Sequence, residues 1–284
     1  MEQILTVIMQ ISVLVFVVTS MLAMGLNLTV SQIIAPLRNA RLVILALVAN
    51  FVLVPILAYL IVLVIPLSQG LGTGLILIAT AAGAPFLPKL AQSAKGNMAF
   101  SVGLMVLLML VTIIYMPLVL PLLLQGVTVD PWEIARSLII LMLVPLAIGL
   151  FIKARYESTA EHLQPSMAQT STVAIVILMV TGLLVNLDAI LGVIGTGGIL
   201  AALIFLVVAF VMAYFMGGSD PGVRSVLGLG TAQRNLSAAL VVAGANFASD
   251  PDVIVMILVA GLLGLVVLML TAGELGKRVQ TAEE

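Results

Sequence analysis

Cysteine is absent from the 284 residues, and histidine occurs only once. A chain without cysteine has no disulfide, no thiolate metal site and no thiol nucleophile. The single histidine, His162, lies near Glu157 and Glu161, and we interpret it as a loop residue rather than a catalytic one. No apolar segment contains paired aspartates, a Ser/His pair or a His/Glu pair, so the sequence does not predict an enzyme.

Charged residues are scarce, because they make up 8% of the chain while hydrophobic residues make up 63%. Soluble domains carry about 25% charged residues, so this composition is that of an all-α polytopic membrane protein. The formal net charge is −1. Such a balance gives no reason to expect a nucleic-acid partner. We expect the lipid bilayer to surround one transmembrane unit over residues 1–284, and we expect no cofactor and no protein partner.

Apolar segments of about 20 residues, the length that crosses a bilayer, recur along the whole chain. The first begins at Ile4 and lacks the basic region and cleavage site of a signal peptide. We therefore count it among nine predicted spans, at about 4–27, 40–65, 71–95, 98–124, 133–155, 166–189, 196–217, 222–247 and 251–275. Pro66, Asp130-Pro131, Pro165, Asp220-Pro221 and Asp250-Pro251 are predicted to mark the joins.

Basic residues predict the orientation of these spans. With the N-terminus outside, nine of the eleven basic residues fall on or toward the cytoplasmic side, Arg136 falls outside and Arg234 lies within a span. Cytoplasmic loops of membrane proteins are enriched in Lys and Arg. We therefore predict an N-terminus outside and a C-terminus in the cytoplasm.

Two predicted spans are interrupted, and they lie at corresponding places in the two halves of the chain. Pro85 and Pro88 interrupt the third span, and Gly228 and Gly230 are expected to break the eighth. Paired broken segments are typical of transporter sites at a repeat interface. The alternative is that Gly and Pro are simply more common in membrane helices.

Arg234 lies near the middle of the eighth segment, between Gln233 and Asn235. A full charge at that depth must face protein, water or a ligand. No Asp or Glu lies deep in any predicted span. Two interpretations stay open: Arg234 binds an anionic substrate, or its donors cap carbonyls of the broken third segment as a structural lock.

Four motifs resemble those of the bile acid:sodium symporter family, in the expected order. They are Met24-Gly-Leu-Asn-Leu28, Asn50-Phe-Val-Leu-Val-Pro55, Ala94-Lys-Gly-Asn-Met-Ala-Phe-Ser-Val102 and Gly230-Thr-Ala-Gln-Arg-Asn235. The resemblance implies two inverted repeats, about 4–124 and 133–275, in a bacterial inner membrane. It also implies a core domain at 40–124 and 196–275, and a smaller panel domain at 4–27 and 133–189.

The family's sodium ligands are replaced at most matching positions. The resemblance places the Ser-Asn pair of the first crossover on Leu87-Pro88, and the Glu and Gln of the second on Gly230 and Arg234. It leaves Asn50 and Ser101 as residual ion-binding candidates, while a Thr becomes Met105. Hard cations need several oxygen ligands, so sodium is not expected to bind in the family's manner, although unwound backbone carbonyls remain.

These observations predict a secondary transporter for a small organic anion, working by alternating access. The predicted contacts are Arg234, Asn235, Gln233, Thr231, Ser237 and Lys89. Lys89 has a second interpretation, in which its aliphatic chain extends along the protein so that the ammonium group reaches water. The functional alternatives are a sodium-coupled symporter, a channel and a non-transporting binding or sensor protein. Arsenite efflux, which a related family performs with a cysteine, does not fit this chain.

Overall fold

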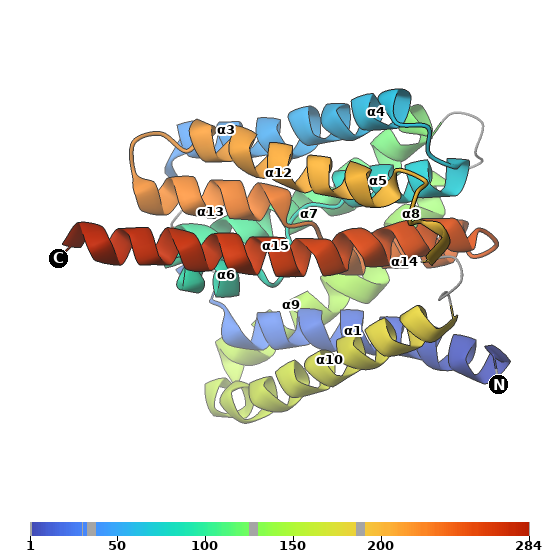
Figure 1. Cartoon of the computed structure of the whole chain (residues 1–284). Helices are drawn as coiled ribbons and strands as arrows, with labels where there is room; N and C mark the ends of the chain where they lie inside the picture. Colours follow the sequence, from blue (N-terminus) through green and yellow to red (C-terminus); the bar gives the residue numbers. More distant parts are fainter. Residues whose placement is uncertain (1, 30, 33–37, 125–129, 186–190, 284) are drawn as a thin grey trace.

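The computed structural model describes residues 2–29, 31–32, 38–124, 130–185 and 191–283, and helices are the regular secondary structure in this part of the chain (Figure 1). Two of the long helices contain a short π-helical stretch, and two further apolar segments are broken into separate helices. In chain order the helices are α1 (Glu2–Asn27), α3 (Ala40–Val48), η2 (Ala49–Leu53), α4 (Val54–Val64), α5 (Gln69–Thr80), α6 (Leu87–Ser93), α7 (Met98–Leu123), α8 (Pro131–Leu138), η3 (Ile139–Leu143), α9 (Val144–Arg155), α10 (Glu157–Val185), α12 (Gly198–Met216), α13 (Pro221–Ala232), α14 (Leu236–Asn246) and α15 (Pro251–Glu283).

Seven helices in the described chain are long and apolar enough to cross a membrane. Two of them are formed by joined elements, α3–η2–α4 and α8–η3–α9. The remaining two predicted spans are each divided, into α5 with α6 and α13 with α14, so a count of nine spans stays a prediction. The end of the predicted span 166–189 lies outside the described residues.

Short polar side chains begin several helices at the predicted joins. The Asp130 carboxylate accepts hydrogen bonds from the backbone N–H groups of Trp132 and Glu133, and Asp220 caps α13 in the same way. The prediction was wrong at Pro165, which lies inside α10. His162 also lies in that helix and not in a loop, with Nδ1 2.7 Å from the Ser158 oxygen. The first turns of α10 are polar, so this helix extends beyond its apolar part toward solvent.

A proline follows each π-helical stretch, at Pro55 and Pro145. Proline has no N–H for the carbonyl four residues earlier. At the first stretch that carbonyl belongs to Phe51, and the Tyr115 hydroxyl of α7 donates to it at 2.6 Å. The wider turn therefore stays hydrogen-bonded, and it sets the position of Asn50 within η2.

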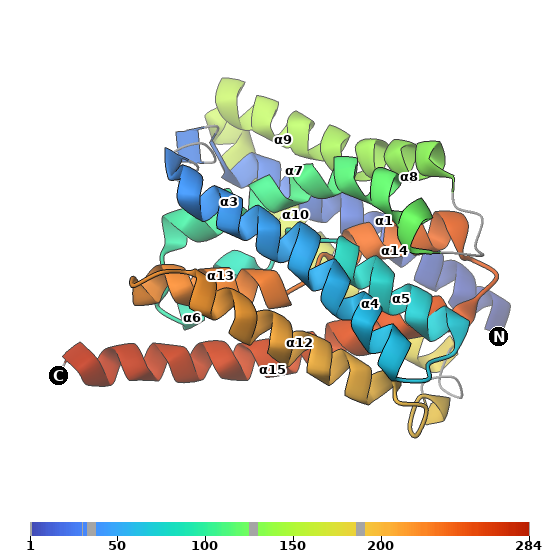
Figure 2. The ribbon, with the colours of Figure 1, turned by 90° about the horizontal axis from the view of Figure 1, so that it is seen from above.

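Helices α1, α9 and α10 pack together on one side of the molecule, apart from the stack formed by α12, α13 and α15 (Figure 1). Seen from above, α8 extends this group toward α7 and α14, with which it is in contact (Figure 2). The predicted division into panel and core, and the inverted repeat, stay predictions.

Gly149 lets α9 approach α1 closely. A Cβ at this position would lie 2.6 Å from the Leu22 oxygen and 2.8 Å from the Gly25 Cα. We expect Gly149→Ala to destabilise this helix pair by about 1–3 kcal/mol, since small residues permit such crossings. Thermal stability in detergent measures the effect. Gly273→Ala, which meets nothing within 4 Å, is the control, and an equal loss in both variants would contradict the expectation.

Candidate functional site

The first break lies between α5 and α6 and is buried from Ala81 to Ala84. Gly83 has φ +80, a left-handed conformation that suits glycine, and its Cβ position is 2.2 Å from the Met109 nitrogen of α7. Thr112, also on α7, accepts from the Ala82 N–H at 2.9 Å and donates to the Ala82 oxygen at 3.1 Å. The unwound backbone is thus held by α7. Pro85 lies within the break, and Pro88 lies in the first turn of α6.

The second break begins later than predicted. Helix α13 continues through Gly228 and Gly230 and ends at Ala232, and α14 starts at Leu236. The two glycines serve close packing instead: a Cβ on Gly228 would lie 3.0 Å from Phe210 and Tyr214, and one on Gly230 would lie 2.8 Å from Leu87. The unwound residues are therefore Gln233, Arg234 and Asn235.

Arg234 joins the two breaks. Its Nε donates to the Ile78 oxygen at 3.1 Å, and its Nη2 donates to the Ala79 oxygen at 2.6 Å. Its Nη1 donates to the Thr231 oxygen at 3.0 Å and to the Asn50 Oδ1 at 2.8 Å. Only 5% of the residue is exposed. These contacts are those of a structural lock, and they use four of the five guanidinium donors.

Asn50 and Thr231 extend this network. Asn50 donates through Nδ2 to the Thr231 hydroxyl at 3.0 Å and to the Ala46 oxygen of its own helix at 3.0 Å. Both side chains are completely buried. Asn50, proposed from the sequence as an ion ligand, therefore binds the guanidinium instead.

Asn235 forms the second link between the breaks. Its backbone N–H donates to the Ala81 oxygen at 2.8 Å, and its Nδ2 donates to the Gly83 oxygen at 3.0 Å. Its Oδ1 accepts from the Ala238 N–H at 3.1 Å and so caps α14. The sequence indicates Asn235 but not Thr112 and Tyr115 of α7, whose hydroxyls hydrogen-bond to Ala82 in the first break and to the Phe51 oxygen of η2. Their spacing of three residues on one helical face was the available signal.

Ser237 and Gln233 have free acceptor atoms beside Arg234. The Ser237 Oγ and the Gln233 Oε1 are buried without a hydrogen-bond partner among the described residues. Two other predicted residues lie elsewhere. Ser101 donates to the Met98 oxygen of its own helix, and Lys89 is exposed on α6.

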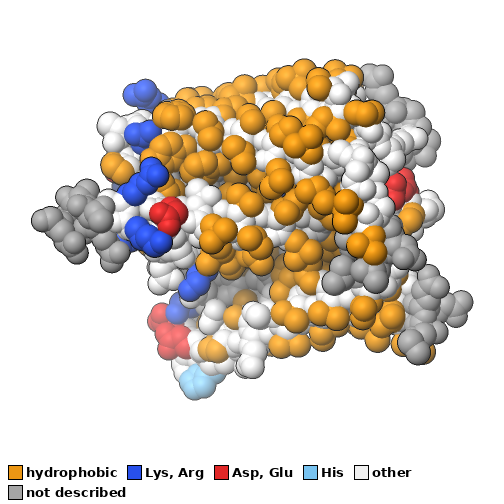
Figure 3. Space-filling model, in the orientation of Figure 1, with side chains coloured by type: hydrophobic (Ala, Val, Ile, Leu, Met, Phe, Trp, Pro, Cys, Tyr) orange, Lys and Arg blue, Asp and Glu red, His pale blue; other side chains and the backbone are white. Residues whose placement is uncertain are grey.

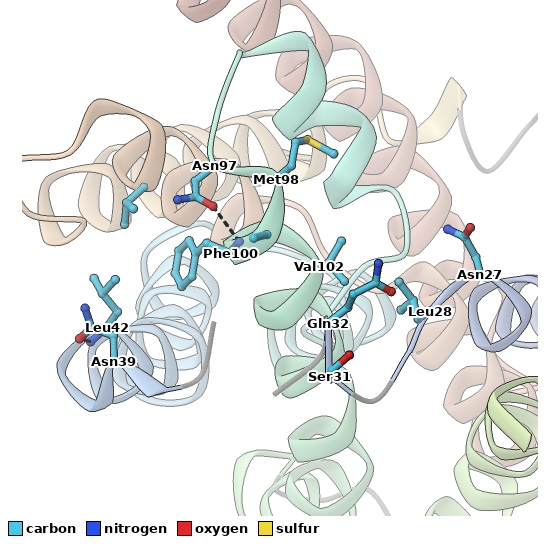
Figure 4. Close-up of a pocket in the computed structure, with 12 residues that line it drawn as sticks. Asn27, Leu28, Ser31, Gln32, Asn39, Leu42, Asn97, Met98, Phe100 and Val102 are labelled. Carbon is cyan, nitrogen blue, oxygen red and sulfur yellow. Dashed lines mark hydrogen bonds between the residues drawn. The ribbon is translucent and has the colours of Figure 1, made fainter. Parts of the chain in front are cut away.

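Three adjoining cavities lead from one end of the molecule to this crossing. The first, about 910 Å³, is lined mainly by uncharged side chains at the ends of α1, α3 and α7, including Asn27, Gln32 and Asn97 (Figure 4). The second, about 650 Å³, contains Lys89 and Gln92. The third, about 480 Å³, reaches Gln233, Arg234 and Ser237.

The cavities share lining residues, which makes them neighbours: Asn27 and Met98 line the first and second, and Ser20 and Ser171 line the second and third. The third lies between α1 and α10 on one side and the breaks with α15 on the other. Lys and Arg side chains gather at the end of the molecule where α15 ends, while apolar side chains cover its flanks (Figure 3).

A family model described as "Sodium Bile acid symporter family" matches residues 13–217. The chain belongs to this family. The description of this family names it as one of symporters, which are membrane transporters. The match ends at Gly217, before α13, α14 and Arg234.

Two relatives of this symporter-family chain come from plants. "Probable sodium/metabolite cotransporter BASS3, chloroplastic" of Arabidopsis thaliana is 27% identical over 205 residues, which are 72% of this chain and 47% of that protein. "Probable sodium/metabolite cotransporter BASS2, chloroplastic" of Oryza sativa subsp. japonica is 31% identical over 144 residues, 50% of this chain and 34% of that protein. The aligned part thus spans less than half the length of either relative.

Proposed function

We propose that this protein is a secondary carrier that moves a small organic anion across the membrane without sodium coupling. The observation that carries the proposal is the Ser237 hydroxyl, which is 1% exposed and unpartnered at the N-terminus of α14, beside Arg234. The positive end of a helix dipole and a hydroxyl donor suit a carboxylate or sulfonate. The fifth guanidinium donor, which has no acceptor among the described residues, is available to the same anion.

The rest of the cavity supports a ligand with an apolar body. Side chains from α1, α10 and α15, among them Phe16, Ile175 and Leu265, line it together with Ser20 and Thr172. Such a mixture of apolar walls and a few polar groups is usual for small-molecule sites. Lys89, in the neighbouring cavity, would attract anions toward the crossing.

We infer the orientation in the membrane from the end of the molecule at which Lys and Arg side chains gather (Figure 3). We place this end, with its adjoining cavities, in the cytoplasm of a bacterial inner membrane, and the N-terminus outside. Transport would then consist of motion between the group of α1, α9 and α10 and the helices around the crossing.

The hydrogen bonds of the Arg234 guanidinium at the crossing of the two breaks support a lack of sodium coupling. The acceptors nearest Arg234 are carbonyl and amide oxygens that already bind its guanidinium. A second cation beside this charge would be repelled. We therefore expect uptake to be the same in sodium chloride and in choline chloride.

Uptake into proteoliposomes tests the proposal, with benzoate and benzenesulfonate as first probes and benzyl alcohol as the neutral control. We expect the anions, and not the alcohol, to bind and be transported. Ser237→Ala should weaken anion binding about tenfold, the effect of losing one hydrogen bond to a charge. Ser225→Ala is the matched control, since this buried serine bonds to the Pro221 oxygen of its own helix.

The outcomes separate the alternatives. Uptake that rises steeply with sodium would support a sodium-coupled symporter and overturn the uncoupled carrier. Binding without uptake would identify a binding or sensor protein. Equal affinity of Ser237→Ala and the parent protein would remove Ser237 from the site.

A further inference from the structure

Four oxygen atoms converge on the Arg234 guanidinium. Three are backbone oxygens, of Ile78, Ala79 and Thr231, and the fourth is the Asn50 Oδ1, at distances between 2.6 and 3.1 Å from the donor nitrogens. We call these four atoms the oxygen cage. The salt bridges found among the described residues involve Lys153 and Lys277, so none of them neutralises this buried charge.

The cage owes its negative potential to two helix ends. Ile78 and Ala79 lie in the last turn of α5, and Thr231 lies in the last turn of α13. The final carbonyls of a helix lack intrahelical donors, and the helix dipole places partial negative charge there. Two such ends facing each other across a buried site would repel, so a cation between them stabilises both.

Such a set of neutral oxygens is also a ligand set for a small hard cation. Half-helix C-termini and unwound carbonyls coordinate sodium in transporters of this general design. The plant relatives are named sodium/metabolite cotransporters. In the present chain, the covalently attached guanidinium occupies the space between the oxygens.

We propose that the oxygen cage is a cation site whose cation is supplied by the chain itself, as Arg234. The guanidinium is a tethered cation: it neutralises the two helix ends permanently and does not leave during a transport cycle. The inference deepens the sodium independence proposed above and does not depend on the identity of the transported anion. It predicts that removing the guanidinium opens the cage to cations from solution.

The experiment is cation rescue of purified Arg234→Ala, followed by its thermal unfolding in detergent. Guanidinium is the first probe, at concentrations far below those that denature proteins, with methylguanidinium and sodium as second probes and choline as the size control. Arg234 lines a cavity of about 480 Å³, so we expect its replacement by alanine to open the cage to small cations from that side. We expect the variant to lose about 10 °C in Tm, and guanidinium to recover much of this loss.

Two matched variants distinguish the tethered charge from simple packing. Arg234→Met fills similar space without charge, so it should stay destabilised in every cation solution. Arg234→Lys keeps a charge and should retain part of the stability without responding to added cations. The parent protein should show no specific response, because its cage is filled.

Two results would overturn the proposal. The first is a folded Arg234→Ala whose Tm is the same in guanidinium, sodium and choline. The second is an Arg234→Met variant as stable as the parent, since the charge would then be unnecessary. If Arg234→Ala yields no folded protein in any cation, the stabilities of Arg234→Lys and Arg234→Met are compared instead. A higher Tm for Arg234→Lys supports the proposal, and an Arg234→Met variant that is at least as stable overturns it. Neither result bears on the proposed anion site at Ser237, because the uptake assay tests that site separately.

Discussion

Gly83→Ala should abolish the folded protein or destabilise it by about 4 kcal/mol or more, among the largest effects that one methyl group can have. The added Cβ would lie 2.2 Å from the Met109 nitrogen and 2.7 Å from the Met105 oxygen, both backbone atoms of α7. Backbone cannot turn aside as a flexible side chain can. The conformation with φ +80 is itself unfavourable for alanine.

The consequence would extend to both breaks, because the Gly83 oxygen accepts the hydrogen bond from Asn235. Displacing Gly83 from α7 therefore also separates the first break from the second. Fluorescence-detected size-exclusion chromatography after heating measures the loss. Gly244→Ala is the control, since nothing lies within 4 Å of its Cβ position, and it should change stability by less than about 1 kcal/mol.

A normal elution profile and an unchanged Tm for Gly83→Ala would show that the first break tolerates a side chain. The packing of the break against α7 described above would then be wrong.

Asn235→Ala should destabilise the protein by about 2–4 kcal/mol. It removes the cap of α14, which is worth about 1 kcal/mol, and leaves the buried Gly83 oxygen without its donor, which costs about 1–3 kcal/mol. The backbone bond from the Asn235 N–H to the Ala81 oxygen stays possible. Thermal unfolding in detergent measures the change.

Asn97→Ala is a matched control for the cap alone. Asn97 caps α7 by accepting from the Phe100 N–H at 2.9 Å, at the rim of a cavity and away from the crossing (Figure 4). We expect this variant to lose only about 1 kcal/mol. Equal losses in the two variants would mean that the bond from Asn235 to Gly83 contributes nothing. Asn235→Asp separates the two contributions further, because it keeps an acceptor for the cap and loses the donor.

Apart from the start of α10, the sequence predicted most helix starts and the position of the first break, for physical reasons. Short capping residues such as Asp130 and Asp220 mark helix starts, and Pro85 removes a backbone donor that a continuous helix needs. These signals are local, so they can be recognised from the hydropathy and from the residues next to each helix boundary.

The second break was placed wrongly because glycine has two uses. The pattern of Gly228 and Gly230 predicts a helix break, whereas in the structure these glycines allow contact with Phe210 and Leu87. Leu87 is distant in the sequence, and no local pattern identifies it as a partner. The partners of Arg234 were predicted in part, because the interpretation as a structural lock named carbonyls of the third segment, and the Ile78 and Ala79 oxygens are two of them. The Asn50 side chain was not predicted as a partner, since it lies far away in the sequence.

The links around Arg234 and Asn235 also have a mechanical consequence. Asn50 of η2, the end of α5, and the facing ends of α13 and α14 are hydrogen-bonded to one another, and Thr112 adds α7. Bending either break alone would rupture several buried bonds at once. We therefore expect these elements to form a stiff block. The compliant parts of the molecule must then be its side-chain contacts with α1 and α10, where the third cavity already separates the two surfaces.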